Sequence, residues 1–425
     1  MSAIKLAANN FKTCKRFATL GRVLVKRLKS VLQLKGQKTT SSRLKPPLKI
    51  KLGQPMIAKS LKSLTGSTDM DPGIWSKLPP ELLENILSFL PLKTFLNLRS
   101  TCKHFNSLVF SPSFISKHSS DSPFSFFLLL SHPQCYGHFP LYDTIIGAWR
   151  NLALPFSFLP PCASQFNLLS SSNGLFLLSL PNSCSFLVCN LLGKSSRVIQ
   201  FPFFPYAFEL LTLVSRPDGY KIFMLCSKFS SSYAFVYDSK VHSWRRYDGF
   251  QPLLIDNFHQ EGASFDGSLH FATPEPFSVV CFDLENGKWE RLNTEMPAEL
   301  TFVRLVSDIG EGKLYLVGGI GRNGISRSMR LWELGNGGNS WEEMERLPEL
   351  MCRKFMSVCY HNYEHVYCFW HQGMICVCCH TWPEILYYKV SRRTWHWIPK
   401  CPSLPDKCSC GFRWFSFVPG LYALA

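Results

Sequence analysis

The sequence has 425 residues, of which 46% are hydrophobic and 14% aromatic, so it can fill two or three sizeable cores and is not a wholly disordered chain. Its 17 cysteines are odd in number and lie in apolar runs without the framework of a small secreted domain, which predicts a reducing compartment. No apolar run approaches the roughly 18 residues of a membrane span.

The net charge of +17 is concentrated at the N-terminus. Residues 1–70 hold 16 Lys and Arg against one acidic residue, Asp69, a net of +15. We interpret 1–70 as a basic, disordered tail, in which 11–35 can form a basic amphipathic helix. Three interpretations of this tail remain open: a solvated tail without a partner, a basic patch for nuclear import or for binding an acidic surface, and an organelle transit peptide.

Residues 72–118 form the second predicted domain, a small all-α bundle. Apolar residues over 78–90 recur three and four positions apart, which predicts a helix that begins near Pro80 and is stopped by Pro91. A second apolar set over 95–108 predicts at least one more short helix that folds back on the first. So small a bundle buries little surface, so we expect another protein or the rest of the chain to cover part of its apolar stripe.

This bundle resembles the F-box, through two Leu-Pro steps and a Cys-Lys pair at set distances. It departs from the usual pattern at Thr101, usually aliphatic, and at Phe105, usually Trp. The resemblance implies a Skp-type adaptor as partner and, through it, a cullin-RING ubiquitin ligase. The positions that it marks as adaptor-binding are Leu78, Pro79, Leu82, Leu83, Ile86, Leu87, Leu90, Pro91, Leu98, Cys102 and Phe105. An ordinary helical hairpin with a leucine stripe is the alternative.

Residues 122–425 are predicted to be all β, because short apolar runs alternate with turn residues. A strand that ends near an acidic or polar residue is followed by a turn, and a Trp opens the next strand. The markers of this repeat are Trp149, Trp244, Trp289, Trp341 and Trp395, with Val198 in the Trp position of a degenerate copy. Successive markers are 49, 46, 45, 52 and 54 residues apart, which predicts a six-bladed, four-stranded, kelch-like β-propeller.

The fifth repeat is the most complete, with strands at 301–307 and 313–319 and a glycine pair, Gly318 and Gly319. In the sixth repeat we expect 365–370 to be the second strand. With the F-box, this repeat pattern resembles the F-box/kelch-repeat proteins of plants. The first repeat has no strand before 124–130, so we expect the spare strand 412–418 to complete that blade and close the ring.

Several matches to chemical motifs are only formal. Gly319, Gly321 and Gly324 form G-x-G-x-x-G in a strand context, without the helix that would bind pyrophosphate. His361-x-x-Glu364-His365 we interpret as a hairpin turn rather than a zinc site. Cys376 and Cys378 should face opposite to Cys379 along a strand, and we interpret them, like the cysteines of 401–410, as buried small hydrophobes. No catalytic, cofactor or metal site is predicted.

These features together predict a multidomain, non-catalytic substrate receptor. The F-box would recruit the ligase and the propeller would hold the target protein, through end loops such as 201–208 and 321–327. The alternatives are a non-degradative kelch-type interaction scaffold and a propeller enzyme. We expect no membrane or nucleic-acid partner and a location in the cytoplasm or nucleus, with organelle import as the minority alternative.

Overall fold

The computed structural model describes two units of the chain, and the predicted tail at 1–70 lies outside the described residues. The first unit is described at 78–90, 95 and 103–108. The second is described at 111, 113–114 and over 126–425 without 136–137, 154–166, 181–182, 194, 203–206, 217, 229–230, 251–258, 336, 339, 405–409, 421–422 and 424.

The first unit contains helices α3 (Pro80–Ser88) and α5 (Lys103–Leu108). Proline suits the first turn of α3 because its missing N–H would have no partner there, and Glu81 complements the positive end of the helix dipole. The predicted start at Pro80 is therefore confirmed, while the predicted stop, Pro91, lies outside the described residues.

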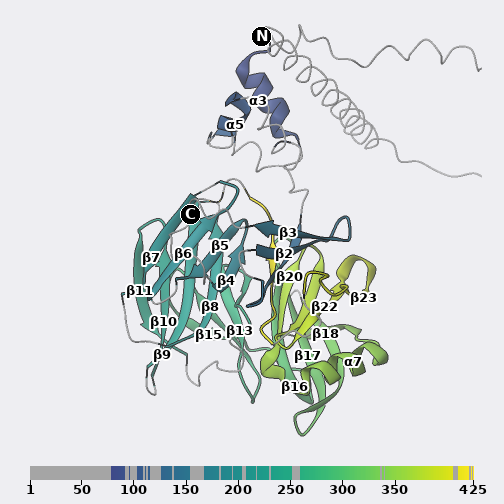
Figure 1. Ribbon diagram of the computed structural model, residues 1–425. Coiled ribbons are helices and arrows are strands. Elements are labelled where there is room, and N and C mark those ends of the chain that lie inside the picture. The colour runs from purple at the N-terminus through teal and green to yellow at the C-terminus, as the bar shows by residue number, and fades with distance from the viewer. Residues whose placement is uncertain are drawn as a thin grey trace, which may run out of the picture. The chain divides into compact units, whose positions relative to one another are not determined.

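The second unit is a propeller of six four-stranded antiparallel sheets (Figure 1). Blade 1 contains β24 (Arg413–Phe417), β1 (Phe127–Ser131), β2 (His138–Asp143) and β3 (Ala148–Ala153). Blade 2 contains β4 (Asn167–Ser172), β5 (Leu175–Ser179), β6 (Ser185–Asn190) and β7 (Ser195–Gln200). Blade 3 contains β8 (Ala207–Arg216), β9 (Gly219–Lys228), β10 (Ser231–Asp238) and β11 (Ser243–Asp248).

The second half of the ring repeats this order. Blade 4 contains β12 (Ala263–Phe265), β13 (Ser268–Ala272), β14 (Val279–Asp283) and β15 (Trp289–Arg291). Blade 5 contains β16 (Leu300–Asp308), β17 (Lys313–Arg322), β18 (Ile325–Leu334) and β19 (Trp341–Arg346). Blade 6 contains β20 (Val366–His371), β21 (Met374–Cys379), β22 (Trp382–Lys389) and β23 (Thr394–Trp397).

Blade 1 is completed by the C-terminal strand, as predicted. β24 pairs antiparallel with β1, from Phe417 opposite Phe127 to Arg413 opposite Ser131. This pairing covers the free edge of β1, so the ring has no open sheet edge at the junction of its first and last blades.

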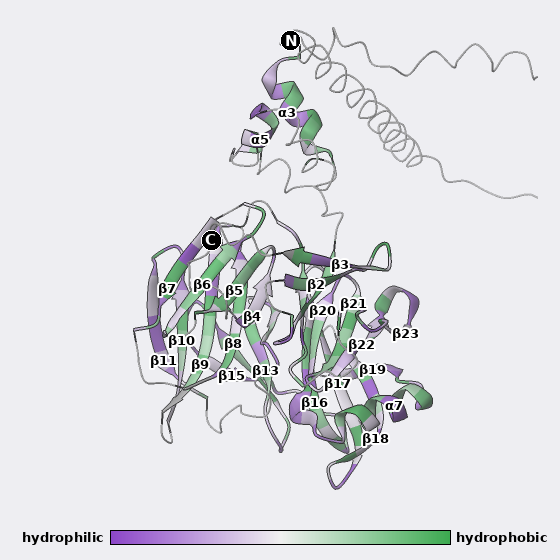
Figure 2. Ribbon diagram, viewed as in Figure 1, coloured by the Kyte–Doolittle hydropathy of each residue, from purple (hydrophilic) through white to green (hydrophobic). Residues whose placement is uncertain are grey.

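The core consists of layers between neighbouring blades. On β1, Leu129 packs in the layer shared with blade 2, whereas Leu128 and Leu130 pack in the layer shared with blade 6. Both faces of the middle strands are therefore apolar, while outer strands such as β7 and β11 carry polar, exposed residues (Figure 2). This is why the strands of the middle positions are continuous apolar runs rather than alternating ones.

Blade 6 differs from the prediction. The segment predicted as its second strand, 365–370, is almost entirely β20, the innermost strand, and β21 is the second. The residues before it form helix α7 (Glu349–Cys359), whose Cys352, Phe355, Met356 and Cys359 pack against the layer between blades 5 and 6. These four positions have helical spacing, and the sequence interpretation overlooked it because it expected strands throughout.

The two ends of the ring differ in their connections. Because strands alternate in direction, the first-to-second and third-to-fourth turns of each blade lie at one end, which we name the turn end. The second-to-third turns and the connections between blades lie at the other, which we name the loop end. The chain enters the propeller at the turn end, since Phe127 pairs with Asp143 beside the β2–β3 turn.

Candidate functional site

Helix α3 presents apolar side chains to solvent. Leu82 is 51% exposed and Phe89, just after the helix, is 62% exposed. These two residues are seven apart, so they lie on the same side of the helix, and Pro79 at its start is also exposed. An exposed leucine and phenylalanine on so small a unit form the kind of apolar patch that a partner protein covers. The sequence analysis missed Phe89, although its spacing from Leu82 was a usable signal.

The other predicted F-box positions divide by burial. Leu78, Leu83 and Ile86 are half-buried. Leu87, Leu90 and Phe105 are buried, so they stabilise the helical unit rather than offer surface. Pro91, Leu98 and Cys102 lie outside the described residues.

The marker tryptophans all lie on outer strands, next to the turn that follows the third strand. Each of them lies opposite an apolar or aromatic residue of the third strand: Trp149 opposite Tyr142, Trp244 opposite Tyr237, Trp289 opposite Phe282, Trp341 opposite Leu334 and Trp395 opposite Tyr388. The indole N–H of Trp244 donates to the carbonyl of Gln200, and that of Trp289 to the carbonyl of Asp248, each at 2.9 Å. Both acceptors lie at or beside the outer strand of the preceding blade, so these residues join blades as well as mark them.

The Trp position of the degenerate repeat was predicted two residues too far along the chain. Asp143 and Asp238 each pair with the first residue of the outer strand, and the preceding residue pairs with the Trp. In blade 2 the corresponding pair is Cys189 with Ser196, so Ser196 takes the Trp position. The predicted residue, Val198, pairs with Leu187 and is half-exposed. A usable signal was the polar residue that ends the third strand: Asp143 and Asp238 each precede the Trp by six residues, and six residues after Asn190 is Ser196.

The polar residue that ends each third strand has a local structural role. Asp143 Oδ1 accepts hydrogen bonds from the backbone N–H groups of Ile145 and Ile146, at 3.1 and 3.2 Å. Asn190 and Asp283 make the same pair of bonds in their own turns. Such side-chain bonds satisfy turn N–H groups that the ladder leaves unpaired.

Gly318 and Gly319 lie in the middle of β17 at a place where a side chain does not fit. A Cβ at Gly319 would stand 2.2 Å from Ser326 Oγ and 2.5 Å from Thr301 Oγ1. These two hydroxyl groups meet above Gly319 at 2.5 Å. The glycine therefore permits a hydrogen bond between the first and third strands of blade 5, across the second. The formal G-x-G-x-x-G continues along β17 to a tight turn at Asn323 and Gly324, both with positive φ, as a hairpin requires.

The inner strands surround a channel that contains a cavity of about 660 Å³. Its walls come from all six blades, and they include Ser172, Thr212, Glu261, Ser307, Arg413 and Ser416. At the loop end, Gln260 crosses between blades: its amide group donates to the carbonyl groups of Leu305 and Cys368, at 3.1 and 3.0 Å, and its side-chain oxygen accepts from the Cys368 N–H. No sequence signal pointed to these residues, because they come from distant segments.

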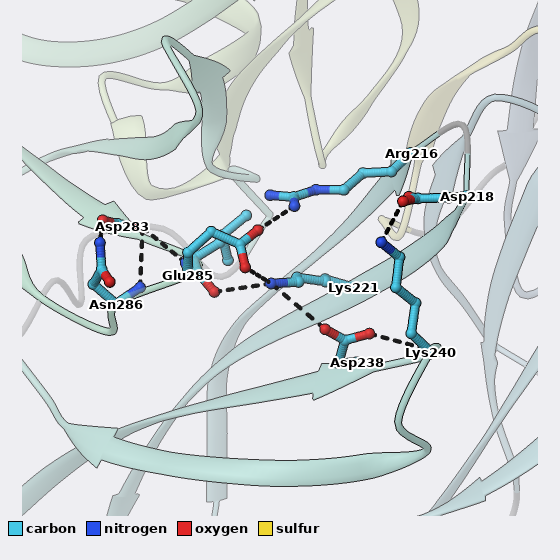
Figure 3. Close-up of polar contacts among 9 residues, drawn as sticks. Arg216, Asp218, Lys221, Asp238, Lys240, Asp283, Glu285 and Asn286 are labelled. Atoms are coloured by element: carbon cyan, nitrogen blue, oxygen red, sulfur yellow. Dashed lines mark hydrogen bonds and ion pairs between the residues drawn. The ribbon is translucent and has the colours of Figure 1, made fainter.

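At the turn end, a charged network links blades 3 and 4 (Figure 3). Lys221 is buried, and its Nζ lies 2.7 Å from Glu285 Oε2, 3.6 Å from Asp238 Oδ2 and 3.1 Å from the Leu284 carbonyl. Arg216 also pairs with Glu285, whose pKa is lowered mainly by its hydrogen bonds to Lys221 and Arg216. Because Lys221 is buried and Glu285 is its nearer carboxylate partner, loss of Glu285 would leave the lysine with only the longer contact to Asp238.

The formal metal motifs find no support in the part of the chain that the structure describes. No group of three or more His, Cys, Asp or Glu side chains there is placed to hold a metal ion. Cys376 and Cys378 pack between blades 6 and 1, whereas Cys379 packs between blades 5 and 6, which confirms the predicted alternation. His361 follows α7 and His365 ends a short 3-10 helix (Tyr363–His365), so the predicted hairpin turn is wrong because a helix, not a strand, precedes it.

None of the helices described here is long and apolar enough to cross a membrane.

Two family models match the chain in the same order as its two units. Residues 75–117 match the F-box domain, and 155–422 match the F-box associated beta propeller domain. The chain belongs to the F-box/propeller family.

This F-box/propeller protein is similar to several plant proteins over most of its own length and most of theirs. It is 55% identical over 370 residues to an F-box/kelch-repeat protein of Arabidopsis thaliana, with 85% of this chain and 91% of that one covered. It is 27% identical over 407 residues to the rice protein ABERRANT PANICLE ORGANIZATION 1 (Oryza sativa subsp. japonica), covering 86% and 93%. It is 25% identical over 365 residues to UNUSUAL FLORAL ORGANS of Arabidopsis thaliana, covering 78% and 80%. The plant F-box/kelch resemblance is therefore confirmed.

Proposed function

We propose that this protein is the substrate-recognition subunit of an SCF-type (Skp-cullin-F-box) ubiquitin ligase. The observation that carries the proposal is the presence, in one chain, of an F-box with an exposed apolar surface and a closed propeller. The F-box implies a Skp-type adaptor, and the propeller implies a target protein. Transfer of ubiquitin belongs to other subunits, so the chain itself is a non-catalytic receptor that works in the cytoplasm or nucleus.

The exposed residues of α3 are the contacts that we propose for the adaptor. Leu82, Phe89 and Pro79 offer apolar area that would leave water on binding, whereas the buried Leu87 and Leu90 hold the helix in shape. Burying the exposed parts of a leucine and a phenylalanine contributes about 1 to 2 kcal/mol each. Replacing both by alanine is therefore expected to weaken adaptor binding by roughly one and a half to three orders of magnitude, at about 1.4 kcal/mol for each factor of ten.

The loop end of the propeller is the surface that we propose for the target. The connections between blades lie there, and both predicted target loops, 201–208 and 321–327, join strands at this end. A receptor of this kind acts by proximity, because it raises the effective concentration of a target lysine near the charged conjugating enzyme.

The test compares two double variants of the full chain. L82A/F89A removes the exposed apolar pair of the F-box, and L350A/Y360A removes two more exposed residues, 79% and 83% exposed, from the propeller. We expect the first variant to lose purified Skp-type adaptor in a binding titration and to lose cullin on isolation from cells, while the second keeps both. Both variants should unfold as the wild type does.

Two results would refute the proposal. One is a wild-type chain that does not bind the adaptor; the other is an L82A/F89A variant that binds it at full strength. A chain that binds adaptor and cullin but whose captured partners are never ubiquitinated, even with degradation blocked, would instead favour a non-degradative scaffold.

A further inference from the structure

The channel contains a half-buried cation, Arg413. Arg413 begins β24 and lines the cavity, where its two terminal nitrogens donate to the carbonyl groups of Leu168 and Leu169, at 3.4 and 3.1 Å. Its guanidinium carbon also lies 5.2 Å from the centre of the Phe415 ring. Among the described residues it forms no ion pair. A guanidinium has five N–H groups, so two carbonyl contacts leave donors unused.

The carboxyl group that acts on Arg413 does not cancel its charge. Glu261 precedes β12 and also lines the cavity. Burial raises the pKa of Glu261 to about 7, against the opposing effects of the Ser170 hydroxyl and Arg413. The group is therefore about half ionised at pH 7 and uncharged in more acidic solution, where it can donate a hydrogen bond. Arg413, whose own pKa is lowered by burial, keeps a positive charge that carbonyl dipoles and a ring only partly offset.

Two of the other polar groups nearby are already engaged. Gln260 uses both ends of its side chain to join blades 5 and 6, and the Thr212 hydroxyl accepts from the Gly262 N–H at 2.9 Å. Arg413 keeps unused N–H donors in the channel, and the Ser171 hydroxyl, which also lines the cavity, is buried without a hydrogen-bond partner among the described residues. A charge in a cavity of this size normally finds a partner, and about 660 Å³ lies within the range of small-molecule sites.

We propose that the propeller channel is a binding site for a small organic carboxylic acid, whose carboxylate is held by Arg413. The planar guanidinium matches a carboxylate with two parallel hydrogen bonds. A monoanion suits the site better than a phosphate dianion, because Glu261 would add repulsion as it ionises. The wall also offers apolar contacts for the body of the ligand, from residues such as Leu213, Leu305 and Phe415. This inference does not depend on the F-box or on ligase activity.

The test uses the purified full chain and three probes in calorimetric titrations: benzoate, benzamide as its uncharged counterpart, and inorganic phosphate. The variants are R413M, R413K and the control R322M, which removes an exposed arginine that pairs with Glu299 at the loop end. We expect benzoate to bind the wild type and R322M with equal affinity and R413M at least tenfold more weakly. R413K keeps the positive charge but not the planar guanidinium that makes two parallel hydrogen bonds, so its affinity for benzoate should lie between those of the wild type and R413M. Benzamide should bind at least tenfold more weakly than benzoate.

Three outcomes would overturn the proposal. Benzoate that binds R413M as well as the wild type would place the ligand elsewhere. If phosphate binding depends on Arg413 and benzoate does not bind, the ligand is not a carboxylic acid. Binding of neither anion at about 20 mM, roughly ten-thousandfold above a micromolar dissociation constant, would leave the cavity a solvent channel. If R413M is unfolded by circular dichroism, R413K and benzamide still decide the question.

Discussion

Removal of residues 411–425 should unfold the propeller rather than trim its end. β24 pairs along its whole length with β1, and Phe412, Trp414, Phe415 and Phe417 are buried. Full burial of one large apolar side chain contributes about 1.5 to 3 kcal/mol, so four contribute roughly 6 to 12 kcal/mol. That is comparable with the whole stability of a domain, roughly 5 to 15 kcal/mol, and the deletion also leaves the edge of β1 open.

A shorter deletion, of 418–425, gives a graded comparison because it keeps β24. It removes the carbonyl groups of Gly420 and Ala423, to which the buried Asn190 amide donates at 2.9 and 2.8 Å. A buried amide without acceptors costs roughly 1 to 3 kcal/mol, so this protein should still fold but be less stable. Deletion of 1–70 is the control that shortens the chain without touching the ring.

The assay is urea unfolding followed by tryptophan fluorescence, together with size-exclusion chromatography. We expect the stability to fall in the order wild type, deletion of 418–425, deletion of 411–425, with the last protein aggregated or unfolded in buffer. A protein without 411–425 that unfolds cooperatively at the wild-type urea concentration would refute the closure argument.

Three further predictions concern other parts of the chain. His371 is buried between blades 1 and 6, and burial lowers its pKa to about 3, so the folded protein favours the neutral imidazole. Its contribution to stability is complete above about pH 6.5 and should fall by about 3 kcal/mol by pH 4. In acid titrations of unfolding, H371Q should reduce this loss and the exposed control H396Q should not. G319A should cost roughly 1 to 3 kcal/mol in urea unfolding because its Cβ would meet two hydroxyl groups, whereas G310A, in an exposed turn, should cost little; equal effects would contradict this. Deletion of 1–70 should change cellular location or surface adsorption and leave adaptor binding intact, and loss of cooperative unfolding would count against a tail without a core role.

Local patterns in the sequence were sufficient for several features. Pro80 at the start of a helical apolar stripe predicted α3, since proline at the first turn costs no hydrogen bond. The polar residue, turn and Trp of the third and fourth strands predicted the blade repeat, because that hairpin is closed by bonds between near neighbours. The spare strand at 412–418 predicted ring closure, because an unpaired edge strand is unstable in water.

Other features depend on contacts between segments far apart in the chain, and only the tertiary structure decided them. α7 replaces a strand because its apolar face fits the layer between blades 5 and 6. Arg413 and Glu261 meet across the channel because ring closure brings the first and fourth blades to one axis, and no spacing in the sequence records that geometry.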